Sequence, residues 1–206
     1  MKSEEKERYA SFEQLDNREK ARFLTNISAI FYMLLILTTL CLWYWNAGCF
    51  FPSNIFIGKI TLSYQISLGF LFGILVYIMW VCIRNFFSQF KLGEYELKEI
   101  LGYPTYLQIF IIAIFSGIGE ELFFRGFLQP YFGIWFTSLM FGIAHPPLTK
   151  NLQLYPLIAT FIGFLLGWLF IFTGGILTPI IVHFFINLMN IYRITRLSED
   201  CQCVES

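Results

Sequence analysis

The stretch Gly119-Glu120-Glu121-Leu122-Phe123-Phe124-Arg125-Gly126-Phe127 places three ionisable side chains inside an apolar run that starts near residue 104. A charge at the centre of a bilayer costs roughly 2.5–3.5 kcal/mol on insertion scales, so such groups usually face a protein interior or a cavity. Glu121 and Arg125 have the spacing that lets them pair on one face of a helix. Glu120 lies about 100° around the helix and has no partner in its own segment. The stretch is therefore either a buried packing cluster or a base, Glu120, held beside a structural pair.

The composition identifies an integral membrane protein. Of the 206 residues, 57% are hydrophobic and only 14% are charged, whereas about a quarter of an average soluble domain is charged. This composition makes membrane lipids expected partners. The formal net charge is zero, so we expect no nucleic acid among the partners. The five cysteines follow neither a disulfide framework nor a zinc-type spacing.

The apolar runs predict an all-α membrane protein, a multi-pass bundle of about six transmembrane helices. The first part, residues 1–103, holds a polar cytosolic segment, two spans near 23–45 and 60–83, and a short amphipathic surface helix over 91–99. The second part, residues 104–195, is expected to form a four-helix core. Its apolar runs are separated by proline and glycine and cover about 104–128, 131–145, 153–173 and 178–195. Residues 196–206 are expected to be a cytosolic tail.

The distribution of Lys and Arg predicts the orientation in the membrane. With six spans and a cytosolic N-terminus, 12 of the 14 Lys and Arg residues fall on the cytosolic side, and the exceptions are Lys59 and Arg125. Positively charged residues concentrate in cytosolic loops. Both chain termini are therefore expected in the cytosol.

Both histidines of the chain lie in the second half. His145 precedes Pro146-Pro147, and because proline disfavours α geometry in the residue before it, His145 is expected at a helix terminus. His183 and Asn187 share one face of a helix that is expected to begin at Thr178-Pro179. Taken singly, His145 fits an interfacial histidine equally well, and the other pair fits a hydrogen bond between helices.

Considered together, these side chains are the parts needed to hydrolyse an amide. The carboxylate of Glu120 and an imidazole can share and deprotonate a water. A second imidazole and a carboxamide one turn away can donate hydrogen bonds to a developing oxyanion. No serine or cysteine has an evident base partner in the sequence, which favours attack by water over a covalent intermediate.

Three motifs in this order resemble the signatures of the CAAX-protease and bacteriocin-processing (CPBP) family, which includes the type II CAAX prenyl endopeptidases. The motifs are Glu120-Glu121-x-x-x-Arg125, Phe141-x-x-x-His145 and His183-x-x-x-Asn187. The resemblance covers about residues 104–195 and shows no departure at any motif position. It implies that the four-helix core is catalytic and that the protein is an intramembrane endopeptidase.

Residue by residue, the resemblance implies a water activated by Glu120 and His145 and an oxyanion site formed by His183 and Asn187. Glu121 and Arg125 would be the structural pair, and Phe141 would pack beside the cavity. The substrate would be a membrane-anchored protein or peptide, for example a prenylated CAAX-type protein. The expected location is the cytoplasmic membrane of a bacterium.

The metal requirement is a separate question. Glu120, His145 and His183 resemble a catalytic zinc set of three protein ligands and a water. No His-Glu-x-x-His spacing accompanies them, and an asparagine one turn from His183 suits an oxyanion better than zinc. We therefore expect no cofactor and no metal, with zinc as the alternative.

Two other functional classes are compatible with the motifs. The first is a non-catalytic membrane scaffold or bacteriocin-immunity protein of the same fold. The second is a small transporter or proton relay in which Glu120 and the histidines carry protons. A transporter predicts polar lining in other spans, whereas the first two spans are almost purely apolar.

Overall fold

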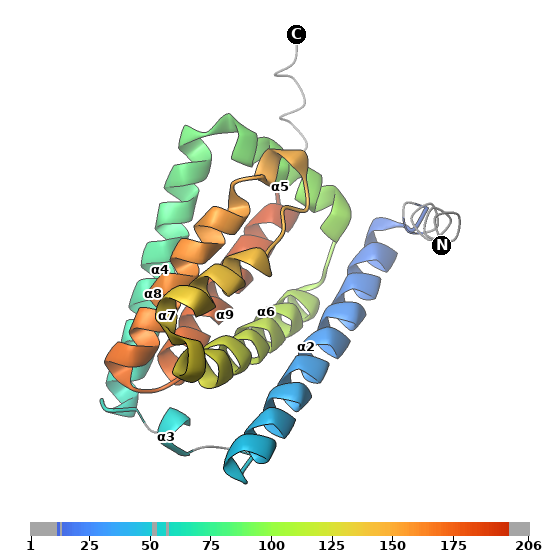
Figure 1. Cartoon of the computed structure of the whole chain (residues 1–206). Coiled ribbons are helices and arrows are strands. Elements are labelled where there is room, and N and C mark those ends of the chain that lie inside the picture. The colour runs from blue at the N-terminus through green and yellow to red at the C-terminus, as the bar shows by residue number, and fades with distance from the viewer. Residues whose placement is uncertain (1–11, 13, 51–52, 57, 198–206) are drawn as a thin grey trace.

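The computed structural model describes residues 12, 14–50, 53–56 and 58–197. Within these ranges every regular element is a helix, so the predicted all-α, multi-pass fold is confirmed. The elements are α2 (Asn17–Ala47), α3 (Ser53–Phe56), α4 (Leu62–Phe86), α5 (Ser88–Leu101), α6 (Tyr106–Glu121), the π-helix η1 (Leu122–Leu128), α7 (Gln129–Ile143), the 3-10 turn η2 (Lys150–Leu152), α8 (Tyr155–Thr173) and α9 (Leu177–Thr195), as Figure 1 shows.

Five helical segments of the described chain are long and apolar enough to cross a membrane: Asn17–Ala47, Leu62–Phe86, Tyr106–Ile143, Tyr155–Thr173 and Leu177–Thr195. The count is one below the expected six because two predicted spans form the single 38-residue stretch Tyr106–Ile143. Inside it, Gly133 has φ 76° and ψ 171° and breaks the helix. The chain reverses there, and the rest of α7 packs along α8 (Figure 1).

The start of α2 and the end of α9 lie at the same end of the bundle (Figure 1). This arrangement agrees with two termini on one side of the membrane, and the assignment of that side to the cytosol stays a prediction. The N-terminal residues 1–11 and the tail residues 198–206, both predicted to be cytosolic, lie outside the described residues.

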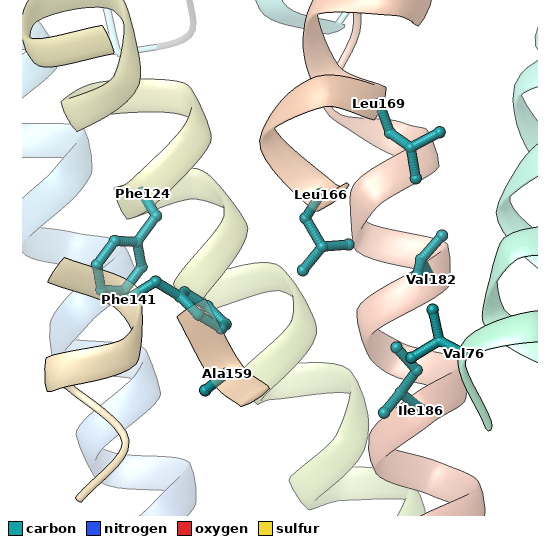
Figure 2. Packing of buried hydrophobic residues seen from close by; sticks show 8 residues of the cluster. All are labelled: Val76, Phe124, Phe141, Ala159, Leu166, Leu169, Val182 and Ile186. Carbon is teal, nitrogen blue, oxygen red and sulfur yellow. The ribbon is translucent and has the colours of Figure 1, made fainter. Parts of the chain in front are cut away.

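The bundle is built on close helix pairs. α4 and α6 both pack along α9, and α7 packs along α8. Glycine allows the closest approach of α4 to α9, because a Cβ at Gly69 would lie 2.7 Å from the side chain of Ile181. Small residues serve this purpose in membrane helices, where backbones must approach closely to gain packing. The central apolar cluster, shown in Figure 2, consists of Val76, Phe124, Phe141, Ala159, Leu166, Leu169, Val182 and Ile186.

Helix α5 covers the segment 91–99, for which the sequence predicts an amphipathic surface helix. The helix crosses one end of the bundle (Figure 1), and its buried residues are Phe90, Gly93, Glu94 and Lys98. The fully buried carboxylate of Glu94 accepts hydrogen bonds from Trp80 Nε1 at 2.9 Å, Arg84 Nε at 2.6 Å and Arg193 Nη1 at 2.7 Å. Because these donors come from α4 and α9, one buried acid joins three helices.

Candidate active site

Glu120 lies in the last turn of α6 and is buried. Its Oε1 accepts a hydrogen bond of 2.9 Å from the hydroxyl of Tyr32 on α2. Its Oε2 has no hydrogen-bond partner within the described part of the chain and lies 3.4 Å from Nε2 of His145. The carboxylate therefore has one engaged oxygen and one oxygen turned toward an imidazole.

His145 follows the end of α7, at the helix terminus predicted from the prolines after it. Its Nδ1 lies 2.7 Å from the carbonyl oxygen of Phe141. Because a carbonyl only accepts, Nδ1 carries the proton, and in the neutral ring Nε2 is an acceptor. Nε2 and the Oε2 of Glu120 are thus two acceptors that face one another, and a single water can donate to both.

The ion pair expected between Glu121 and Arg125 is present. Arg125 Nη1 donates to Glu121 Oε1 at 2.9 Å, and both side chains are fully buried. Arg125 Nη2 donates to the carbonyl of Gly163 at 3.0 Å, and its guanidinium lies 4.4 Å from the ring centre of Phe141. Arg125 belongs to the π-helix η1, a rare geometry that often occurs at functional sites.

His183 joins this buried pair instead of standing free. Its Nδ1 lies 2.7 Å from Glu121 Oε1, the same oxygen that binds Arg125. Its helix, α9, begins at Leu177 rather than at the expected cap Thr178, whose hydroxyl donates to the Gln65 carbonyl at 3.1 Å. His183 is therefore oriented by a fully buried carboxylate.

Asn187 lies one turn further along α9 and faces α6. Its Nδ2 donates to the hydroxyl of Ser116 at 2.8 Å, and that hydroxyl donates to the Ala113 carbonyl at 3.1 Å. A carboxamide NH2 has two N–H groups. One of them is used by Ser116, so the other can donate to a further acceptor.

A cavity of about 360 Å³ adjoins part of this site. Glu120, His145 and Asn187 line it together with Ser116, Tyr32 and Tyr155. Trp80, Glu94 and Leu97 of α4 and α5 complete its walls. Three of the four catalytic candidates, Glu120, His145 and Asn187, therefore open onto a cavity whose walls include residues of the first half, whereas His183 is not part of its lining.

The geometry does not assemble the alternative zinc set. Among the described residues, no group of three His, Cys, Asp or Glu side chains is placed to hold a metal ion. Glu120 and His145 are adjacent, but the Nδ1 of His183 contacts Glu121 instead. The absence of a metal requirement stays a prediction, which chelation tests directly.

Two residues at this site were missed by the sequence analysis. Ser116 lies one helical turn before Glu120 on α6, and this spacing could have identified it as a polar residue on the same face. Tyr32 lies in a distant apolar span. No sequence pattern connects it to Glu120, because the contact arises only from the way α2 packs on α6.

The same segment is recognised by comparison with known proteins. Residues 103–189 match the family model of the Rce1-like type II CAAX prenyl endopeptidases. The Bacillus subtilis (strain 168) protein YpbD, which is described as uncharacterized, is 32% identical over 90 residues. That match covers 44% of this chain and 47% of YpbD, so it spans about half of the relative. No solved structure matches the chain. The resemblance indicated by the three motifs is thus confirmed: residues 103–189, which carry them all, are similar to the Rce1-like type II CAAX prenyl endopeptidase family.

Proposed function

We propose that this protein is an intramembrane endopeptidase that hydrolyses a peptide bond with a water activated by Glu120 and His145. The family match supports a membrane endopeptidase of the CAAX-protease type. The observation that carries the residue roles is the 3.4 Å approach of Glu120 Oε2 to His145 Nε2 at the wall of a cavity. Both atoms are acceptors there, which is the arrangement that positions and deprotonates a water.

The proposed reaction begins with a water that donates hydrogen bonds to Glu120 and His145. Glu120 takes one proton as the water oxygen forms a bond to the substrate carbonyl carbon, and the carbonyl oxygen becomes an oxyanion. The carbon–nitrogen bond then breaks. The proton held by Glu120 passes to the leaving nitrogen, so a carboxylic acid and an amine are released and the enzyme returns to its starting state.

Asn187 is the proposed donor to the oxyanion. Its second N–H is available beside the cavity, while Ser116 holds the carboxamide in place. His183 Nδ1 donates to Glu121, so Nε2 donates to an oxyanion only when the ring carries both protons. The carboxylate of Glu121 offsets the charge of that imidazolium. Donors fixed in advance in a site that excludes water stabilise the developing charge.

The proposed substrate is a membrane-anchored protein or peptide of the prenylated CAAX type. The printed description of the matching family supports this class. A bacterial relative and the distribution of Lys and Arg support a bacterial cytoplasmic membrane with both termini in the cytosol. A cavity with many apolar walls next to a polar site suits a chain held at a lipid surface.

The test uses purified full-length protein in detergent and a fluorescence-quenched, farnesylated CAAX peptide. We expect cleavage by the wild type and loss of at least about 100-fold in kcat for Glu120→Gln and His145→Ala, since a positioned base contributes about 10²–10⁴-fold. Glu96→Gln is the control, because Glu96 is an exposed acid on α5. Chelation should leave the rate unchanged.

The outcomes of this test distinguish the metal-free mechanism from a zinc mechanism, and an endopeptidase from a non-catalytic protein. Loss of activity on chelation, restored by zinc, would contradict the metal-free mechanism. If neither the farnesylated peptide nor its unmodified counterpart is cleaved by the wild type, the endopeptidase proposal is wrong. The chain would then fit the non-catalytic scaffold or bacteriocin-immunity alternative.

A further inference from the structure

We infer that Tyr32 of α2 is a positioning residue of the active site, which orients the Glu120 carboxylate toward His145. The effect of Tyr32 on catalysis rests on the proposed function, whereas the place of Tyr32 beside Glu120 rests on the described contacts alone. Tyr32 lies outside the matched segment 103–189. The three motifs therefore do not include it.

The packing of α2 on α6 holds Tyr32 in place. Gly119 lies directly beside the tyrosine, and a Cβ at Gly119 would be 3.4 Å from both Cβ and Cδ1 of Tyr32. This is an ordinary van der Waals separation, so α2 and α6 are in close contact at this point. The hydroxyl group then reaches Glu120 Oε1, 2.9 Å away. The packing of α2 on α6 beside Glu120 thus brings the tyrosine within hydrogen-bond distance of the carboxylate.

The hydrogen bond selects one orientation of the carboxylate. The last torsion of a glutamate side chain is broad and roughly two-fold, so packing alone defines it poorly. Tyr32 binds Oε1, and Oε2 is left to face His145. Hydrogen bonds to ionised acceptors are about twice as strong as neutral ones. Removal of the hydroxyl leaves the carboxylate free to turn away from the water it must deprotonate.

The first experiment measures kcat and KM for Tyr32→Phe with the farnesylated, fluorescence-quenched CAAX peptide. We expect kcat to fall about tenfold, a typical effect of losing one hydrogen bond to a charged group, with KM within about twofold. Tyr44→Phe is the matched control, since Tyr44 is an exposed tyrosine on the same helix and its ring stacks on Phe50. The control should keep the wild-type kcat.

A second experiment measures the effect of Tyr32→Phe in the Glu120→Asp variant and separates a positioning role from a loss of structure. In Glu120→Asp the carboxylate is one methylene shorter and is withdrawn from the Tyr32 hydroxyl. The further change Tyr32→Phe should then have little additional effect on the residual rate. A full tenfold loss in both backgrounds would show that the tyrosine acts independently of the carboxylate, and would overturn the inference.

A spectroscopic measurement keeps the inference testable without activity. The infrared difference spectrum of the wild type minus Glu120→Gln isolates the carboxyl bands of Glu120. The same difference is then measured with Tyr32→Phe present in both proteins. We expect the carboxyl bands of Glu120 to be shifted in this second spectrum. If the wild type cleaves nothing but the bands shift, the proposed function fails while the contact stands. Unshifted bands together with an unchanged kcat would refute the positioning role.

Discussion

Glu120 and His145 face one another at 3.4 Å, although Glu120 precedes the break at Gly133 and His145 follows the end of the helical stretch Tyr106–Ile143. In an unbroken α-helix their Cα atoms would be about 37 Å apart, at roughly 1.5 Å per residue. The reversal at Gly133 brings them together. Its φ of 76° and ψ of 171° fall in a region that only glycine occupies readily. A residue far from the cavity thus determines whether the two proposed catalytic groups can meet.

We therefore expect Gly133→Ala to lower both the unfolding free energy and kcat. The backbone cost of such a conformation is about 1–3 kcal/mol, and a Cβ at this position would meet no atom within 4 Å, so the effect is conformational rather than steric. Gly48→Ala is the matched control, with φ 66° and open space around it but a ψ of 13° in the left-handed helical region. Thermal unfolding in detergent and peptide cleavage provide the two measurements. Equal effects of both substitutions would contradict this account.

The second prediction concerns the proposed oxyanion donor. Asn187→Asp keeps the shape of the side chain and removes both N–H groups, so kcat should fall about 10²–10³-fold with a small change in KM. Ser116→Ala, which removes only the group that orients the carboxamide, should have a smaller effect. A Ser116→Ala variant slower than Asn187→Asp would show that the hydroxyl itself, and not the amide, serves the reaction.

The third prediction concerns the buried ion pair. Arg125→Met leaves the fully buried Glu121 carboxylate without its cation, and breaking such a pair costs about 3–5 kcal/mol of stability. The double variant Glu121→Gln, Arg125→Met removes both charges and should recover much of that loss. Unfolding temperatures of the wild type, the single variants Arg125→Met and Glu121→Gln, and the double variant measure the coupling. If the two single losses simply add, the charges do not interact as described.

The fourth prediction tests the role of α5. Glu94→Gln removes the charge that three donors from α4 and α9 share, so we expect a stability loss of about 1–3 kcal/mol. Glu96→Gln on the same helix should change stability by less than about 1 kcal/mol, because exposed polar contacts contribute little. Unfolding in detergent compares the two variants. A neutral Glu94→Gln would show that the buried carboxylate is not needed to hold α5 in place.

The sequence was sufficient for features that depend on local spacing. The spans, the pairing of Glu121 with Arg125 and the helix-terminal position of His145 follow from hydropathy, the helical repeat and the effect of proline. These rules act within a few residues, so one chain is enough to apply them. The family match then confirmed the resemblance carried by the motifs.

Features that depend on tertiary packing could not be predicted. The contact of Tyr32 with Glu120 joins two separate spans, and the burial of Glu94 depends on cations from two other helices. The charged pattern of α5 is the same for a helix on the surface and for a helix that closes the bundle. The resemblance implied an oxyanion role for His183, and only the structure shows that its Nδ1 contacts Glu121.

Both halves of the chain contribute residues to the walls of the cavity. The groups proposed to cut the substrate lie in the second half of the chain, whereas Tyr32, Trp80, Glu94 and Leu97 of its lining lie in the first half. Substitutions in the first half can therefore reshape the space available to a substrate without changing any motif residue. The shape of the cavity is thus set partly by residues outside the motifs, so proteins with identical motifs need not have cavities of the same shape.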